Sequence, residues 1–239
     1  MSRRPLVSGQ RYEATMVRRP RRGPLRVLLI VNPTQDLGGA EEEGLELRTF
    51  LEEYHPAVEL VMVDGDARNP EQRATLDRVR TLLRSERFDV VHYAGHARFA
   101  SGAPADSGLS CADGGLLTPD ELGTLEHPPA FVFLNACESG RVRGDEDNAA
   151  PGDDQGVGVV SGLAEGFLRA GVGHFLGSFW AVEDRAASCF STVVYTKLID
   201  GESFGDAVLA GRRELKRKGL GHWFNYVFYG TTDVRLVES

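Results

Sequence analysis

Short apolar runs alternate with amphipathic segments along this chain, and this alternation restricts the fold more than any other feature. RVLLIV at residues 26–31 and VELVMV at 58–63 carry few polar residues, as strands buried on both faces do. Between them, residues 40–54 place leucines among glutamates, which predicts a helix with one buried side. A second amphipathic segment at 71–87 and a third apolar run at 89–94 repeat the order. This βαβαβ order predicts a parallel sheet with helices on both faces.

The second half of the chain interrupts the alternation and then resumes it. Residues 107–118 alternate around a Gly-Gly turn, which predicts an inserted β-hairpin, and residues 118–121 open a short helix. Residues 140–156 contain almost no apolar side chain and predict a mobile acidic loop. Further strands are expected at 131–136, 174–182 and 223–230, with helices at 159–170, 186–199 and 204–218. These segments complete an α/β fold with six sheet strands.

Charge divides the chain into a basic arm, residues 1–25, and an acidic domain, residues 26–239. A total of 239 residues with 41% hydrophobic content fits one large domain. The arm holds seven arginines against Glu13, a net of +6, so the total of −8 leaves −14 for the domain. Because the arm is short and lacks interleaved aromatics, we expect a flexible tail, a docking segment or a cleavable leader, and no nucleic-acid binding.

Several classes of protein are not expected from the sequence. The chain has no apolar run near the roughly 20 residues that span a bilayer, and no secretory leader follows its basic start, so we expect a cytoplasmic protein without a membrane partner. The three cysteines, Cys111, Cys137 and Cys189, include no CxxC pair. Neither a disulfide framework nor a structural zinc site is therefore predicted.

A histidine and a cysteine follow two of the predicted strands. His96 comes directly after the strand at 89–94, and Cys137 directly after the strand at 131–136. In an open parallel sheet, functional groups collect beyond the carboxyl ends of the strands, where several loops converge. If the two strands are neighbours, an imidazole and a thiol emerge side by side at one rim.

These two residue types suit nucleophilic catalysis. An imidazole can accept the proton of a thiol and so generate the strongly nucleophilic thiolate, and it can later protonate a departing amine. Backbone N–H groups at a tight turn after a strand can hold the oxyanion of a tetrahedral intermediate, and Ala97, Cys137 and Glu138 are the candidates. No metal or organic cofactor is needed for such chemistry.

The segments HYAGHA, which contains His96, and FLNACESG, which contains Cys137, resemble the catalytic histidine and cysteine motifs of the CHAT domain family. This family lies within the caspase, gingipain and separase group of cysteine peptidases. SGLSCADGGLLTPDEL, GSFWAVED, FGDAVLAGRREL and WFNYVFYG resemble further family segments, so the resemblance covers about residues 26–230. It implies a caspase-like three-layer α/β/α sandwich with a mostly parallel six-stranded sheet. It also implies that His96 and Cys137 are catalytic. One departure is Ala97, where the family often has glycine, because alanine keeps the N–H but restricts the backbone angles.

The same resemblance bears on the substrate. In separase-like and gingipain-like relatives an acidic residue lines the pocket for the P1 side chain, and Asp184 matches its place, with Glu183 as the rival. A carboxylate there would pair with a guanidinium or ammonium, which predicts cleavage after Arg or Lys. Trp180 would wall the pocket, unless it is a packing residue. A caspase-like preference for Asp at P1 would need basic residues in this pocket. Arg185 is the only basic residue nearby in the sequence.

The resemblance further implies a protein substrate, a role in bacterial defence or conflict signalling, and a separate activator or regulatory protein, unless the peptidase is constitutively open. Arg141 and Arg143 offer basic sites for self-processing close to Cys137. Two other classes stay open: a non-hydrolytic caspase-like interaction module, and a flavodoxin-like small-molecule sensor. His92 is expected to be a buried, hydrogen-bonded histidine, although its spacing of four from His96 also permits a metal site.

Overall fold

The computed structural model describes residues 23–66, 68–98, 107–135, 155–178, 182–221 and 223–237, with backbone alone for 155–161. The basic arm lies almost entirely outside these residues, and so does most of the acidic loop predicted at 140–156. The division into arm and domain therefore stays a prediction.

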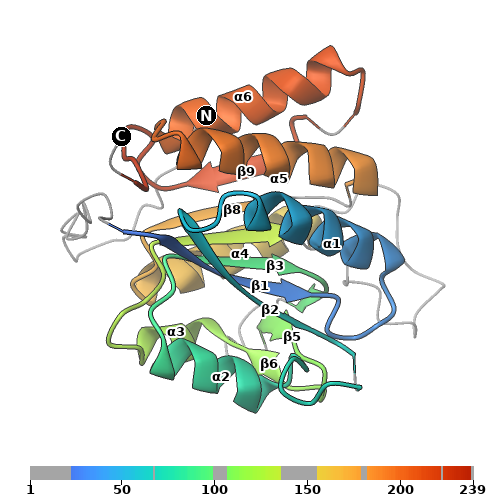
Figure 1. Cartoon of the computed structure of the whole chain (residues 1–239), viewed down its shortest axis with the longest axis vertical. Coiled ribbons are helices and arrows are strands. Elements are labelled where there is room, and N and C mark those ends of the chain that lie inside the picture. The colour runs from blue at the N-terminus through green and yellow to red at the C-terminus, as the bar shows by residue number, and fades with distance from the viewer. Residues whose placement is uncertain are drawn as a thin grey trace.

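A six-stranded sheet forms the centre of the molecule (Figure 1). Its order is β2-β1-β3-β7-β8-β9, and every pairing from β2 to β8 is parallel, whereas β9 runs antiparallel to β8. The strands are β1 (Leu25–Val31), β2 (Val58–Asp64), β3 (Val90–Ala94), β7 (Phe131–Asn135), β8 (His174–Ser178) and β9 (Tyr226–Tyr229). Every residue of β3, β7 and β8 is buried, because helices cover both faces. The predicted mostly parallel sheet is confirmed.

Helices cover the two faces in separate layers, so the predicted three-layer sandwich is also confirmed. One face packs against α1 (Gly38–Glu52), α5 (Asp184–Ile199) and α6 (Phe204–Arg217). The other packs against α2 (Leu76–Ser85), α3 (Pro119–Gly123) and α4 (Gln155–Arg169). Each face has its own apolar core. Within the described ranges, no helix has both the length and the apolar character needed to cross a membrane.

The predicted hairpin belongs to a small antiparallel sheet beside the main one. β5 (Gly108–Ser110) pairs with β6 (Leu116–Leu117), and Gly114 at φ +79° allows the chain to turn between them. The sequence had not indicated a third strand, β4 (Ala97–Arg98), which pairs with β5. Because β4 starts immediately after His96, this small sheet adjoins the end of β3.

The largest shifts from the predicted element boundaries are at the starts of α2 and α4. α2 begins at Leu76, because the Thr75 hydroxyl caps it there and the chain before it forms a turn. α4 begins at Gln155, inside the segment predicted as loop. β8 is described as far as Ser178, residues 179–181 lie outside the described residues, and Asp184 is the first residue of α5.

Candidate active site

The ends of β3 and β7 lie next to each other, as the sequence predicts. The two strands pair in parallel with Ala94 opposite Asn135, and the Gly95 N–H donates to the Asn135 carbonyl at 3.2 Å. His96 therefore lies two residues after the end of β3. In the sequence, Cys137 lies two residues after the end of the neighbouring strand β7. Cys137 itself lies outside the described residues, as does Glu138.

Two groups hold the backbone carbonyl of His96. The buried Tyr93 hydroxyl lies 2.6 Å from the His96 carbonyl oxygen, and the Ser110 N–H donates to the same oxygen at 2.9 Å. Burial raises the pKa of Tyr93 well above its usual value, so the hydroxyl stays protonated and can donate. A Cβ on Gly95 would come within 2.7 Å of this hydroxyl and 3.0 Å of Pro33, which is why the turn needs glycine.

The His96 imidazole makes a close contact with a carboxylate that the sequence analysis missed. Its Nε2 lies 3.0 Å and 3.1 Å from the two oxygens of Asp36. The hydroxyl of Thr34 donates to Asp36, and this bond, followed by the bond and charge of His96, lowers the pKa of that carboxyl. His96 Nδ1 is buried and has no hydrogen-bond partner among the residues that the structure describes. The imidazole is thus held at one nitrogen and open at the other.

The loop that carries Asp36 has a defined shape. Asn32 and Gln35 adopt left-handed backbone angles, φ +38° and +60°, and the Asn32 side chain accepts from the Leu37 N–H at 3.1 Å. The Asn32 N–H also donates to the Ala94 carbonyl at 2.8 Å, which ties this loop to β3. The rule that functional groups gather beyond strand ends would have found Asp36, since this loop follows the neighbouring strand β1.

The carboxylate of Asp184, the first residue of α5, lies against the first turn of α1. A Cβ built on Gly39 would come within 1.9 Å of Asp184 Oδ1, so the carboxylate covers this glycine. Gly39 is three residues after Asp36, so Asp184 lies at the same rim as the His96 contact. Its side chain is exposed and has no ion-pair partner in the described part of the chain. Glu183, the residue before it, is also exposed, whereas Trp180 lies outside the described residues.

The remaining predicted residues have the following places. Ala97 is the first residue of β4, is buried and pairs with Leu109. His92 is fully buried, with Nδ1 3.2 Å from the Tyr195 hydroxyl, as expected of a hydrogen-bonded core histidine. His92 and His96 have different partners, and the described side chains include no group of three His, Cys, Asp or Glu placed to hold a metal ion.

The two other thiols differ from each other. Cys111 is buried, and burial, reinforced by the charge of Asp113, raises its pKa to about 12, as is typical of an inert core thiol. Cys189 is only partly buried on α5 and lies 3.4 Å from the Lys218 ammonium, so it is not a fully buried core residue.

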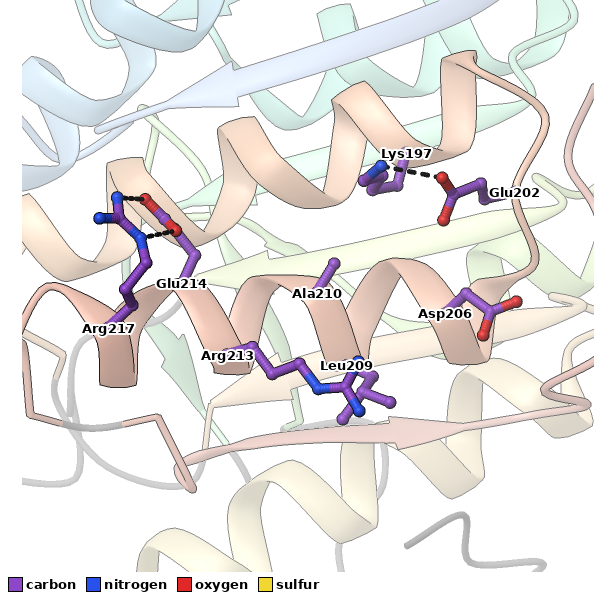
Figure 2. A pocket seen from close by; sticks show the side chains of 8 residues that line it. All are labelled: Lys197, Glu202, Asp206, Leu209, Ala210, Arg213, Glu214 and Arg217. Carbon is purple, nitrogen blue, oxygen red and sulfur yellow. Dashed lines mark hydrogen bonds and ion pairs between the residues drawn. The ribbon is translucent and has the colours of Figure 1, made fainter.

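An open hollow of about 420 Å³ lies on the outer surface of α5 and α6 (Figure 2). Its charged groups largely pair within it: Lys197 with Glu202 at 2.8 Å, and Glu214 with Arg217 at 2.6 Å. All of its lining residues come from the second half of α5, from α6 and from the short turn between them, and none from the loops around His96. It is therefore separate from the candidate active site.

Comparison with known proteins identifies the family and the fold. The model of the CHAT domain family matches residues 3–228. No curated protein matches the chain.

Three solved structures are similar over most of this chain. Separase in the Saccharomyces cerevisiae separase–securin complex is 16% identical over 87% of this chain and 12% of its own, with a TM-score of 0.50. The Arg-specific cysteine proteinase gingipain R is 15% identical over 88% and 47%, with a TM-score of 0.52. The complex of Porphyromonas gingivalis RgpB pro- and mature domains gives 14% identity over 89% and 48%, with a TM-score of 0.54. The chain thus spans about an eighth of the separase and about half of the gingipain chains. The likeness shows the caspase-like fold of these peptidases.

Proposed function

The chain belongs to the CHAT domain family, and from this premise we propose that it is a cysteine endopeptidase in which Cys137 and His96 form a catalytic dyad. The observation that carries the proposal is the pairing of β3 with β7, with Ala94 opposite Asn135. Each proposed catalytic residue follows its strand end by the same two positions. Since successive Cα atoms are about 3.8 Å apart, two peptide units keep Cys137 within about 8 Å of the end of β7.

The proposed mechanism starts from the hydrogen bonding of His96. Asp36 holds the proton on Nε2, which leaves the lone pair on Nδ1 to accept the proton of the Cys137 thiol. The thiolate attacks the scissile carbonyl carbon, and the N–H groups of Ala97, Cys137 and Glu138 are the candidates to bind the oxyanion. The imidazolium then protonates the leaving amine, and an acyl-enzyme remains. Water, deprotonated by His96, hydrolyses this thioester and restores the thiol.

We further propose that the enzyme cleaves after Arg or Lys. An exposed Asp184 carboxylate without an ion-pair partner in the described residues can pair with a guanidinium or ammonium of the substrate. Glu183 is the alternative carboxylate at this rim, and Trp180 is the proposed wall of the pocket. Gingipain R, which has a similar fold, is an Arg-specific cysteine proteinase, and this supports the proposed preference.

A series of fluorogenic peptides that differ only at P1 tests both parts of the proposal. We expect kcat/KM to be highest for Arg or Lys, intermediate for neutral residues and lowest for Asp. Asp184→Ala should lower kcat/KM for the basic peptides by about 10²-fold and leave neutral peptides within a few-fold. Glu183→Ala, the matched control one residue away, should have little effect; the opposite result would assign the pocket to Glu183.

Regulation is the third part of the proposal. A protein substrate, a separate activator and a role in bacterial conflict signalling, acting in the cytoplasm, accord with family membership, and the similar structures include complexes with securin and with a pro-domain. Self-processing is tested by incubating the purified protein and measuring intact mass. Fragments ending at Arg141, Arg143 or within 18–22 are expected, and an unchanged mass after long incubation would contradict self-processing.

A further inference from the structure

A carboxylate is buried beneath the candidate active site. Glu43 lies on the side of α1 that faces the sheet, in line with Ala40 and Leu47, and is only 4% exposed. Burying a carboxylate is unfavourable unless polar groups compensate it. The other buried residues of α1 are alanine, glycine and leucine. Glu43 therefore stands where an apolar residue is expected, and it provides a hydrogen-bond acceptor that such a residue would lack.

The partners of Glu43 come from two strands. The Asn135 side-chain amide donates to Glu43 Oε1, and His92 Nε2 lies 3.5 Å from the same oxygen. On the other side of the ring, His92 Nδ1 lies 3.2 Å from the Tyr195 hydroxyl. Burial, reinforced by the charge of Glu43, raises the pKa of Tyr195 well above its usual value, so this hydroxyl keeps its proton and can donate to Nδ1. In the tautomer that accepts this bond, the His92 proton is on Nε2, on the side of Glu43.

Asn135 connects this buried cluster to the proposed nucleophile. It is the last residue of β7, is 6% exposed and precedes Cys137 by two residues. Its backbone carbonyl accepts from the Gly95 N–H, beside His96, while its side-chain amide donates to Glu43 on α1. The amide of Asn135 therefore sets the position of the strand end from which Cys137 follows.

One segment of the chain touches each part of the site. The loop before α1 carries Asp36, which binds His96; the first turn of α1 carries Gly39, beneath Asp184; and the second turn carries Glu43, which binds Asn135. Helix α1 is thus the common reference for the base, the P1 carboxylate and the nucleophile. We propose that Glu43 is a positioning residue that holds Asn135, and through it Cys137, in register with His96. This inference rests on the proposed peptidase function.

Exchanging donor and acceptor tests the inference. Asn135→Asp would place two carboxylates against each other in a buried site, and we expect kcat to fall by about 10²-fold with KM little changed, since displaced catalytic groups slow the chemical step. The double variant Glu43→Gln/Asn135→Asp restores an amide–carboxylate pair with the roles reversed. We expect it to regain kcat to within about tenfold of the wild type, and Glu43→Gln alone to lose less than Asn135→Asp.

Two controls separate positioning from stability. Leu47→Ala removes a buried contact of α1 one turn further along, so it should lower the unfolding midpoint without lowering kcat at a temperature well below that midpoint. Where Asn135→Asp does not fold, Asn135→Ser takes its place, because the shorter hydroxyl does not reach Glu43. The same loss of kcat is expected.

The outcomes are distinguishable. If the wild type neither cleaves peptides nor reacts with a peptidyl chloromethyl ketone, the proposed function is wrong. If the wild type cleaves and the folded Asn135 variants keep the wild-type kcat, the proposed function stands and the positioning role of Glu43 is wrong. A loss of kcat that the double variant does not recover would also overturn the pairing.

Discussion

The two ends of the sheet use polar side chains differently. At the amino end, Arg26 of β1 pairs with Glu86 at 2.5 Å and Glu59 at 3.1 Å and lies over the ring of Phe88. At the same end, His174 starts β8, where its Nδ1 lies 3.3 Å from a backbone carbonyl and its ring stacks on Phe204 and Phe228. These groups have partners within the protein and can serve stability alone.

At the carboxyl end, polar groups retain capacity that the described part of the chain does not use. His96 Nδ1 and Asn135 Oδ1 are buried without a hydrogen-bond partner, and Asp184 is exposed without an ion-pair partner there. Unsatisfied polar groups are costly, so they persist where binding or chemistry uses them. The difference between the ends indicates which one acts on a substrate, and variants at each end can test it.

The largest effect is expected for His96→Ala. Without the imidazole, neither the thiol proton nor the leaving amine has its acid–base partner, so kcat/KM should fall by about 10⁴-fold. The measurement is cleavage of a basic P1 peptide by purified, folded protein. A residual kcat/KM within tenfold of the wild type would contradict the proposal that the carboxyl end of the sheet carries the catalytic site.

A smaller loss is expected for Asp36→Asn, since Asp36 acts through His96. We expect kcat to fall by about 10- to 100-fold, as for other residues that orient a functional histidine. Because its pKa is lowered from 3.8, Asp36 is charged at every pH above this value, and its contact with His96 is lost only as the pH falls below it. Wild type and variant should be compared at one pH above 5, where Asp36 is charged, because a catalytic histidine can itself titrate between pH 5 and 8. A variant kcat equal to that of the wild type would contradict the assignment.

The matching variant at the amino end is Arg26→Met. It removes partly exposed ion pairs but keeps an aliphatic chain over Phe88, so the free energy of unfolding should fall by only about 1 kcal/mol. Urea denaturation measures this change. Peptide cleavage by the folded variant should be unaffected, and a loss of kcat would show that the amino end also takes part in function.

The smallest effect is expected for His174→Gln. Burial, partly opposed by hydrogen bonds of the ring to the backbone of Ala130 and Thr231, lowers the pKa of His174 below 6.5. Between this lowered value and 6.5 the unfolded chain binds a proton that the folded protein does not, so wild-type stability rises with pH across this window. Urea midpoints measured from pH 4 to 8 should change less with pH in the variant. An identical pH dependence would show that His174 does not contribute.

Much of the fold could be predicted because burial on both faces leaves a clear signal in the strands. The runs at 26–31, 58–63 and 131–136 are largely apolar, and each became a strand of the sheet, although β2 at the edge of the sheet is only partly buried. Helix faces were harder to assign: Leu45 was expected on the buried side of α1 but is 47% exposed, whereas Glu43 takes a buried place. Residue type alone predicts that the leucine is buried and the glutamate exposed. It fails here because the partner that offsets the cost of burying Glu43, Asn135, is distant in sequence.

The site was predictable to the extent that it depends on strand ends. The adjacency of the His96 turn and the end of β7 follows from topology, and the structure confirms it. Asp36 follows the neighbouring strand β1, so the same rule could have found it, but its contact with His96 depends on the left-handed turns at Asn32 and Gln35, which local sequence patterns do not specify. Asp184 is the first residue of α5, and its role in the P1 pocket stays a prediction.

The most direct test of the account is the rate at which a chloromethyl ketone with a basic P1 residue alkylates Cys137, located by peptide mass spectrometry. The account predicts saturable labelling of Cys137 in the wild type, slower by about 10³-fold or more in His96→Ala, and little labelling of Cys111 or Cys189. Equal rates with and without His96, or labelling that does not favour Cys137, would contradict the claim that these two strand ends form one catalytic site.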